Sequence, residues 1–123
     1  MIKEVAMLST ALLLLDAVYL NLVGKFYGKM IRAIQGSEME VRWSSAVVTY
    51  IFIVIQIYYF IIKENRSAVD AFLLGLTTYG IYDFTSFALL KKYSLNAALM
   101  DTIWGGLLYF LTIKIYKIMK QYA

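Results

Sequence analysis

The 123-residue sequence contains no cysteine, no histidine and no proline, and charged residues make up only 16% of it. Without cysteine, the chain can form neither disulfides nor thiolate metal sites. Without histidine, it can form neither a Ser-His-Asp triad nor an imidazole proton relay. No nucleic-acid-binding pattern is present, and no cofactor is predicted. Any chemistry must therefore come from carboxyl, hydroxyl, phenol or backbone groups.

Hydrophobic residues, in contrast, make up 62% of the chain, and its mean hydropathy is +0.69. Soluble domains contain about 45–50% hydrophobic residues, and a chain this small has too much surface to bury a larger share. The composition therefore predicts a multi-pass membrane protein whose main partner is the lipid bilayer. The net charge of +4 favours contact with anionic lipid headgroups over contact with nucleic acid.

Four segments are long enough to cross a bilayer, which takes about 20 mostly apolar residues. They are residues 5–23, 45–63, 68–90 and 96–118. The last three are joined by short connections, which makes them antiparallel neighbours. The sequence thus predicts one all-α domain over residues 1–123, a polytopic membrane protein with four transmembrane helices in an antiparallel bundle. Its orientation stays open, because six basic residues are expected on each side of the membrane.

The first connection, residues 24–44, is longer than the others and partly amphipathic. Four apolar residues recur there at helical spacing among three basic ones: Phe26, Met30, Ile31 and Ile34, with Lys25, Lys29 and Arg32. This pattern predicts a short interfacial helix in the plane of the headgroups; a solvated basic loop is the alternative. Trp43 and the three basic residues are therefore predicted to lie at the lipid interface.

Three acidic residues fall inside the predicted spans: Asp16, Asp83 and Asp101. A charge at the bilayer centre costs about 2.5–3.5 kcal/mol, so such residues face the interior of a bundle. The helical rise places them about 3, 6 and 9 Å from the centre, all toward the side opposite the N-terminus. They predict a polar pocket open toward that side and sealed by apolar side chains on the other. Its further candidate residues are Tyr19, Tyr79, Tyr82, Thr85, Ser86 and Trp104.

No lysine or arginine is expected at the depth of these three carboxyl groups. They must therefore be protonated, hydrogen-bonded, or paired with a bound cation. If that cation were a metal ion, Asp16, Asp83 and Asp101 would be its ligands. The alternative is that they are neutral hydrogen-bonding groups that fix the register between helices.

Three sequence runs resemble a known family. They are Leu15-Asp16-Ala17-Val18-Tyr19-Leu20 followed by Phe26-Tyr27, then the run from Tyr79 to Leu90 (YGIYDFTSFALL), then Asp101-Thr102-Ile103-Trp104-Gly105. In this order they resemble the DUF2177 family of predicted integral membrane proteins, with the pattern L-D-x-x-W-L, F-Y, Y-x-x-Y-D-L-T-N-x-A-x-L and D-x-x-W-G. Tyr19, Ser86 and Tyr93 depart from it, standing where the family usually has Trp, Asn and Trp. The resemblance implies four spans and the same three aspartates, and it implies no activity.

Three functions are compatible with this sequence. The first is a carboxylate-lined pocket that binds or transports a cation or small cationic solute, for which a homo-oligomer would complete a path. The second is a structural or assembly protein in a larger membrane complex or a virion inner membrane. The third is an intramembrane enzyme in which Asp83 and Asp101 share a proton. The signature motifs of such enzymes are missing, so the sequence favours a protein without catalytic residues.

Overall fold

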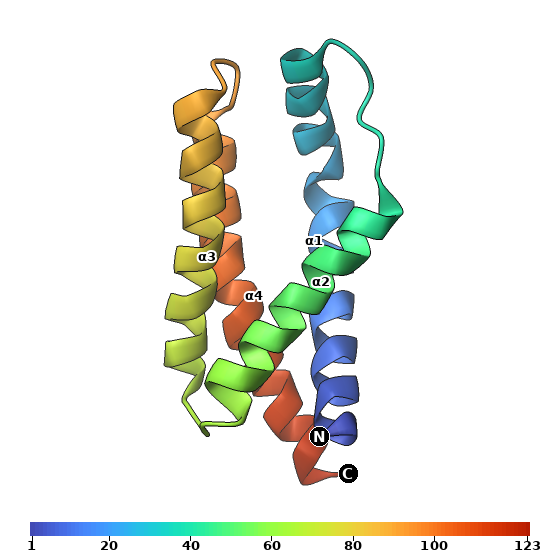
Figure 1. The fold of residues 1–123 in the computed structure, drawn as a ribbon, viewed down its shortest axis with the longest axis vertical. Coiled ribbons are helices and arrows are strands. Elements are labelled where there is room, and N and C mark those ends of the chain that lie inside the picture. The colour runs from blue at the N-terminus through green and yellow to red at the C-terminus, as the bar shows by residue number, and fades with distance from the viewer.

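The computed structural model describes residues 1–123 and contains helices and no strands. The helices are α1 (Ile2–Gln35), α2 (Trp43–Ile57) with its π-helical continuation η1 (Tyr58–Ile62), α3 (Ala68–Leu89) and α4 (Leu95–Gln121). Figure 1 shows that successive helices run in opposite directions and that both termini lie at one end. We call this end the terminal end, and the other, with the α1–α2 connection and the α3–α4 turn, the distal end. The prediction of an all-α fold is confirmed.

Three segments are long and apolar enough to cross a membrane: Ile2–Gln35, Trp43–Ile62 and Leu95–Gln121. The fourth helix, α3, has 22 residues, which also suffices in length. It is less apolar because threonine, tyrosine and aspartate residues occupy much of its second half. Length and composition therefore establish three candidate spans and a fourth helix.

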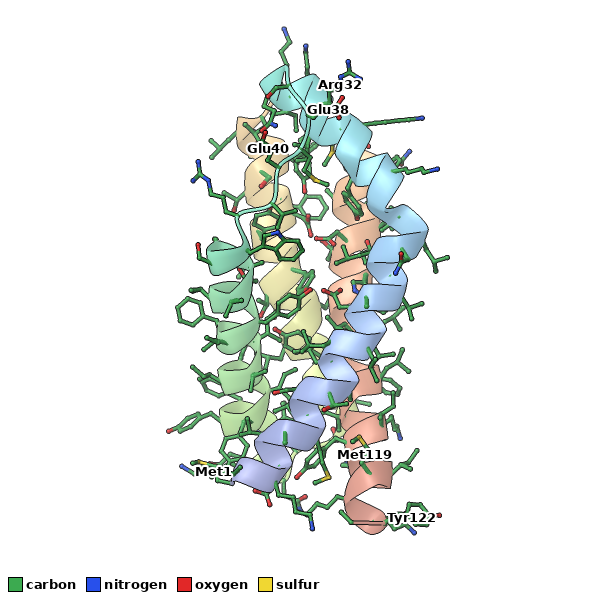
Figure 2. The ribbon with its side chains drawn as sticks, turned by 90° about the vertical axis from the view of Figure 1, so that its right-hand side faces the viewer. Met1, Arg32, Glu38, Glu40, Met119 and Tyr122 are labelled. Atoms are coloured by element: carbon green, nitrogen blue, oxygen red, sulfur yellow. The ribbon has the colours of Figure 1, made fainter.

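Charged side chains gather at the two ends of the molecule. Every lysine and arginine is exposed. Figure 2 shows Arg32, Glu38 and Glu40 at the distal end, opposite Met1 and Tyr122 at the terminal end. Arg32 Nη1 lies 3.1 Å from Glu38 Oε1. No basic side chain is therefore buried among the helices.

The predicted separate interfacial helix is wrong, because α1 continues without a break to Gln35. No proline interrupts it, and it ends only at Gly36, whose left-handed backbone (φ 77°) suits glycine. Met30 is buried against Tyr93 and the start of α4, where Ile31 and Ile34 are partly buried, whereas Phe26 is 42% exposed. At about 1.5 Å per residue, α1 is about 51 Å long. This exceeds the roughly 30 Å of a hydrocarbon core.

The α3–α4 pair is the most closely packed part of the fold, because glycines let the two backbones approach. A Cβ on Gly75 would clash with the carbonyl oxygen of Gly105 and lie 2.6 Å from Tyr109 Cγ. A Cβ on Gly105 would lie 2.5 Å from Tyr79 Cβ. The turn between the helices ends at Ser94, whose hydroxyl accepts a hydrogen bond from the Ala97 amide at 3.2 Å. This pair therefore fixes the relative positions of its side chains.

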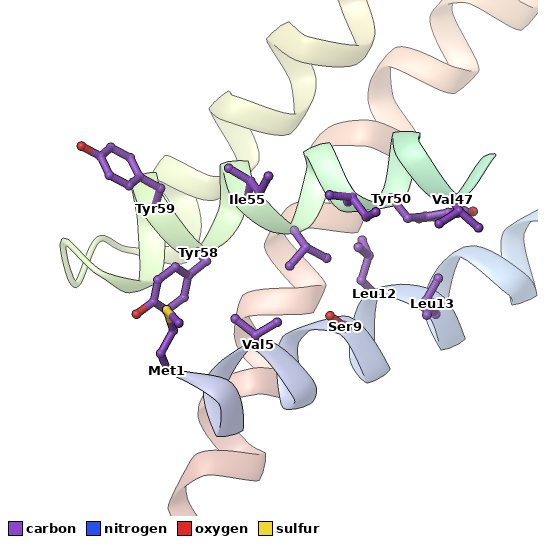
Figure 3. A pocket seen from close by; sticks show the side chains of 12 residues that line it. Met1, Val5, Ser9, Leu12, Leu13, Val47, Tyr50, Ile55, Tyr58 and Tyr59 are labelled. Carbon is purple, nitrogen blue, oxygen red and sulfur yellow. The ribbon is translucent and has the colours of Figure 1, made fainter. Parts of the chain in front are cut away.

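The main apolar core fills the terminal half of the molecule. It contains 12 buried residues from all four helices: Met7, Leu8, Leu12, Ile53, Ile57, Ile61, Ala68, Ala71, Leu108, Tyr109, Ile113 and Tyr116. The α2 segment and η1 contribute only three of their six isoleucines to these buried residues, and most of their large apolar side chains are exposed or partly exposed. Between α1 and α2 a groove of about 610 Å³ remains, lined by apolar side chains apart from Ser9. Figure 3 shows residues from both helices, among them Leu13 and Tyr59, around this groove.

Candidate functional site

The carboxyl groups of Asp83 and Asp101 lie beside each other, one on α3 and one on α4, close enough to share a proton. Asp83 is fully buried, and Asp101 is partly exposed. The hydroxyl of Thr102 lies next to the Asp83 carboxyl group. Neither Asp83 Oδ2 nor Thr102 Oγ1 makes a hydrogen bond of normal geometry, although both are buried. Because buried polar atoms are nearly always paired, and the Asp101 carboxyl group lies beside Asp83, a proton shared between the two carboxyl groups would supply the missing partner of Asp83 Oδ2.

Aromatic side chains cover this pair on its distal side. Tyr93, in the α3–α4 turn, donates a hydrogen bond to Asp83 Oδ1 at 2.8 Å and is itself buried. Burial and the neighbouring Asp83 carboxyl group raise the pKa of Tyr93, so its hydroxyl stays protonated as a donor. The hydroxyls of Tyr19 and Tyr27 lie 2.7 Å apart, and that of Tyr19 also lies beside the Asp101 carboxyl group. These aromatic side chains therefore lie on the distal side of the carboxyl pair, where the sequence predicted that the polar pocket would open.

Asp16 has two hydrogen-bond donors of its own. Trp104 Nε1 donates to Asp16 Oδ1 at 3.0 Å, and the Tyr50 hydroxyl donates to Asp16 Oδ2. Asp16 is buried, and its hydrogen bonds join α1 to α2 and to α4. The ring of Tyr19, whose hydroxyl lies beside Asp101, stacks on that of Trp104, with ring centroids 4.5 Å apart. Both carboxylate oxygens of Asp16 therefore accept hydrogen bonds from the protein, as expected for a structural contact between helices. In the Asp83–Asp101 pair, by contrast, Asp83 Oδ2 accepts none.

A groove of about 660 Å³ leads to this pair from the side, between α2 and α3. Asp101 is the only charged residue that lines it. Its walls carry four aromatic rings and polar groups from both helices: Phe52, Phe60, Tyr79 and Tyr82, with Thr49, Gln56 and Thr78. Figure 1 shows that α2 leans away from α3 toward the distal end. The groove thus opens sideways, toward the surface that faces lipid in a membrane protein.

The remaining predicted site residues are spread over α3. Tyr79 and Tyr82 line the groove, and Tyr82 is 63% exposed. Ser86 is half-buried, next to the hydroxyl of Tyr82. Thr85 is exposed on the surface of α3. The structure therefore brings two of these four residues to the groove and leaves Thr85 and Ser86 outside it.

The residues predicted to contact lipid headgroups are exposed at or near the distal end: Lys25, Lys29, Arg32 and Trp43. The three basic residues lie on the last turns of α1, and Trp43 begins α2. Their contact with headgroups stays a prediction.

Sequence reasoning missed several polar contacts inside the bundle. Tyr50, inside the second predicted span, donates a hydrogen bond to Asp16. Tyr109 donates to Gln56 Oε1 at 2.5 Å, and Gln56 Nε2 donates to Thr78 Oγ1 at 2.7 Å, which joins α4, α2 and α3. Because α2 is apolar on all sides, no periodicity in its sequence indicates which way Tyr50 or Gln56 points.

Metal binding by all three aspartates has no geometric support. No three acidic side chains are grouped closely enough to hold a metal ion, and both carboxylate oxygens of Asp16 already accept hydrogen bonds. The paired carboxyl groups of Asp83 and Asp101 can instead hold a shared proton, or one carboxylate can pair with a cation that fits the groove.

Comparisons with known proteins identify the family. Neither the curated proteins nor the solved structures give a match. The model of the family described as "Predicted membrane protein (DUF2177)" matches residues 1–115. This span includes the three aspartates and all four helices except the last turns of α4. The chain therefore belongs to the DUF2177 family of predicted membrane proteins and is a multi-pass membrane protein.

Proposed function

We propose that this protein binds a cation inside the membrane, at the paired carboxyl groups of Asp83 and Asp101. The observation that carries the proposal is that these two groups lie together, without a basic partner, and that Asp83 Oδ2 is buried and unpaired. Two adjacent carboxylates cannot both be ionised cheaply at low dielectric. The pair therefore takes up a positive charge, either as a shared proton or as a cationic solute. Ionisable residues inside membranes commonly have such roles.

The proposal includes a four-span topology, in which α3 also crosses the membrane. Its 22 residues give a length of about 33 Å, against about 30 Å for the hydrocarbon core. Asp70 lies near one end and Lys91 just beyond the other, at the levels of the two interfaces. Asp83, the acid that makes α3 less apolar, is fully buried. It therefore adds no cost from contact with lipid.

A catalytic aspartyl pair is the second candidate, favoured by the same closeness of Asp83 and Asp101. Such a pair must reach the bond that it cleaves. Asp83 is fully buried and hydrogen-bonded to Tyr93, so only Asp101 is open to a substrate. Cation binding needs one open carboxyl group, and it therefore fits the arrangement better.

The test compares the melting temperature of the purified protein in detergent across a pH series and in sodium, potassium and ammonium chloride. A cation at about 100 times its Kd stabilises the folded state by about 2.7 kcal/mol. We expect the wild type to depend on pH or cation, and the double variant Asp83→Asn/Asp101→Asn to lose this dependence. Other ionisable groups near the pair are Tyr19, Tyr27, Tyr82, Tyr93 and Asp16.

The matched control is Asp70→Asn, which removes an acid from the same helix where it lies 3.9 Å from Arg66 at the surface. This variant should keep the wild-type dependence on pH and cations. If the double variant keeps it as well, Asp83 and Asp101 are structural hydrogen-bonding groups and the proposal is wrong.

A further inference from the structure

We infer that the groove between α2 and α3 admits an organic cation with an aromatic or apolar body, which reaches Asp101 sideways from the lipid. This inference rests on the proposed function and adds the class of ligand and its route. Its basis is the coincidence of one carboxyl group, four aromatic rings and an open side in a single groove of about 660 Å³.

The size and lining of the groove fit a small organic molecule. Binding sites for such molecules have volumes of about 300–1,000 Å³ and mostly apolar walls with a few polar groups. The rings of Phe52, Phe60, Tyr79 and Tyr82 supply faces that attract a cation. No lysine or arginine lines the groove to compete for Asp101. Its charge and its walls therefore both select for an apolar cation.

The Asp83 carboxyl group, on which the proposed function also rests, lies beside that of Asp101. Asp83 is fully buried, and its Oδ2 has no hydrogen-bond partner. Because no basic side chain lies beside the pair, the two carboxyl groups keep one negative charge between them even when they share a proton. A cation at Asp101 would compensate both carboxyl groups.

A ligand can reach Asp101 from the side of the bundle, through the groove between α2 and α3. On the distal side, Tyr93 and the Tyr19–Tyr27 pair cover the carboxyl groups, and Met30 packs against Tyr93. On the terminal side lies the main apolar core. By contrast, Phe52 is 66% and Phe60 52% exposed along the mouth of the groove. A solute dissolved among the lipid chains could therefore reach Asp101 without crossing the protein.

The groove between α1 and α2 provides the internal comparison. Its volume, about 610 Å³, is similar, but it contains no charged side chain. Its exposed tyrosine, Tyr59, is 51% exposed, close to the 63% of Tyr82 in the proposed site. The two tyrosines thus form a matched pair, one beside a carboxyl group and one not.

The experiment measures binding of tetraphenylphosphonium to the purified protein in detergent by isothermal titration calorimetry. Tetraphenylborate, with nearly the same shape and the opposite charge, serves as the second probe. We expect tetraphenylphosphonium to bind, Asp101→Asn to weaken it about tenfold or more, and Tyr82→Leu about two- to fivefold, as a cation–π contact at an exposed site would. Tyr59→Leu should leave the affinity unchanged, and tetraphenylborate, titrated in a separate experiment, should not bind.

Equal binding of the two probes, or equal effects of Tyr82→Leu and Tyr59→Leu, would overturn the inference. Both tyrosines are exposed, so these variants report on binding even if Asp101→Asn fails to fold. The two proposals can also fail separately. If the wild type responds to pH or small cations through Asp83 and Asp101 but does not bind tetraphenylphosphonium, the organic-cation site is wrong and the cation-binding pair stands.

Discussion

The α3 and α4 helices meet backbone to backbone, whereas α2 contacts the rest of the molecule mainly through three isoleucine side chains and two polar ones. Gly75 and Gly105 have no room for a Cβ, while most of the α2 surface is exposed. We therefore infer different roles for the α3–α4 pair and for α2. The close pair holds Asp83 and Asp101 at fixed positions, and the loosely held helix forms the wall of the groove that leads to them.

The largest effect is expected for Gly75→Ala, which places a methyl group against the Gly105 carbonyl and the Tyr109 ring. Since a backbone atom cannot move aside as a flexible side chain can, α3 and α4 must separate. We expect a loss of about 3 kcal/mol in the free energy of unfolding, the upper part of the range for overpacked cores. Reversible unfolding in mixed micelles measures it.

The control for this substitution is Gly24→Ala in α1, where a new Cβ meets nothing within 4 Å. Helix propensity alone should then stabilise the protein by up to about 1 kcal/mol. Equal effects of the two alanines would mean that α3 and α4 are not in close contact.

A smaller effect is expected for Tyr50→Phe, which removes the hydrogen bond from α2 to Asp16 and keeps the ring. Hydrogen bonds between membrane helices contribute about 0.6 kcal/mol on average and up to about 1.7. We expect a loss of about 1 kcal/mol in the same unfolding measurement. Tyr59→Phe, at an exposed position on the same groove, should change the stability by less than about 0.5 kcal/mol. A loss as large for Tyr59→Phe would show that Asp16 does not hold α2.

The sequence indicated at which level of the bundle each aspartate lies, but not which way each helix is rotated about its own axis. The short α3–α4 connection and the helical rise place Asp83 and Asp101 at similar levels on neighbouring helices, and they do lie together. Asp16 also has a suitable depth, but only the rotation of α1 decides that it faces Tyr50 and Trp104 instead of the pair. For the same reason, a uniformly apolar α2 gave no sign that Tyr50 points inward.

The length of α1 was the other feature that the sequence obscured. Gly24, Lys25 and Gly28 suggest the end of a span, and they do mark where apolar residues give way to basic ones. The helix nevertheless continues, because Met30 and its neighbours bury apolar surface against Tyr93 and the start of α4. This contact joins residues more than 60 positions apart in the sequence, so the local pattern around Met30 could not predict that the helix continues.

The most direct test of the shared positive charge is the infrared absorption of protonated carboxyl groups, measured near neutral pH on the wild type and on single asparagine variants. If Asp83 and Asp101 share a proton, the wild type shows a carbonyl stretch of a protonated carboxyl group that shifts in heavy water. The band should disappear or move in Asp83→Asn and in Asp101→Asn and persist in Asp70→Asn. With no organic or metal cation added that could replace the proton, absence of the band from the wild type, or its persistence unchanged in both variants of the pair, would contradict the account.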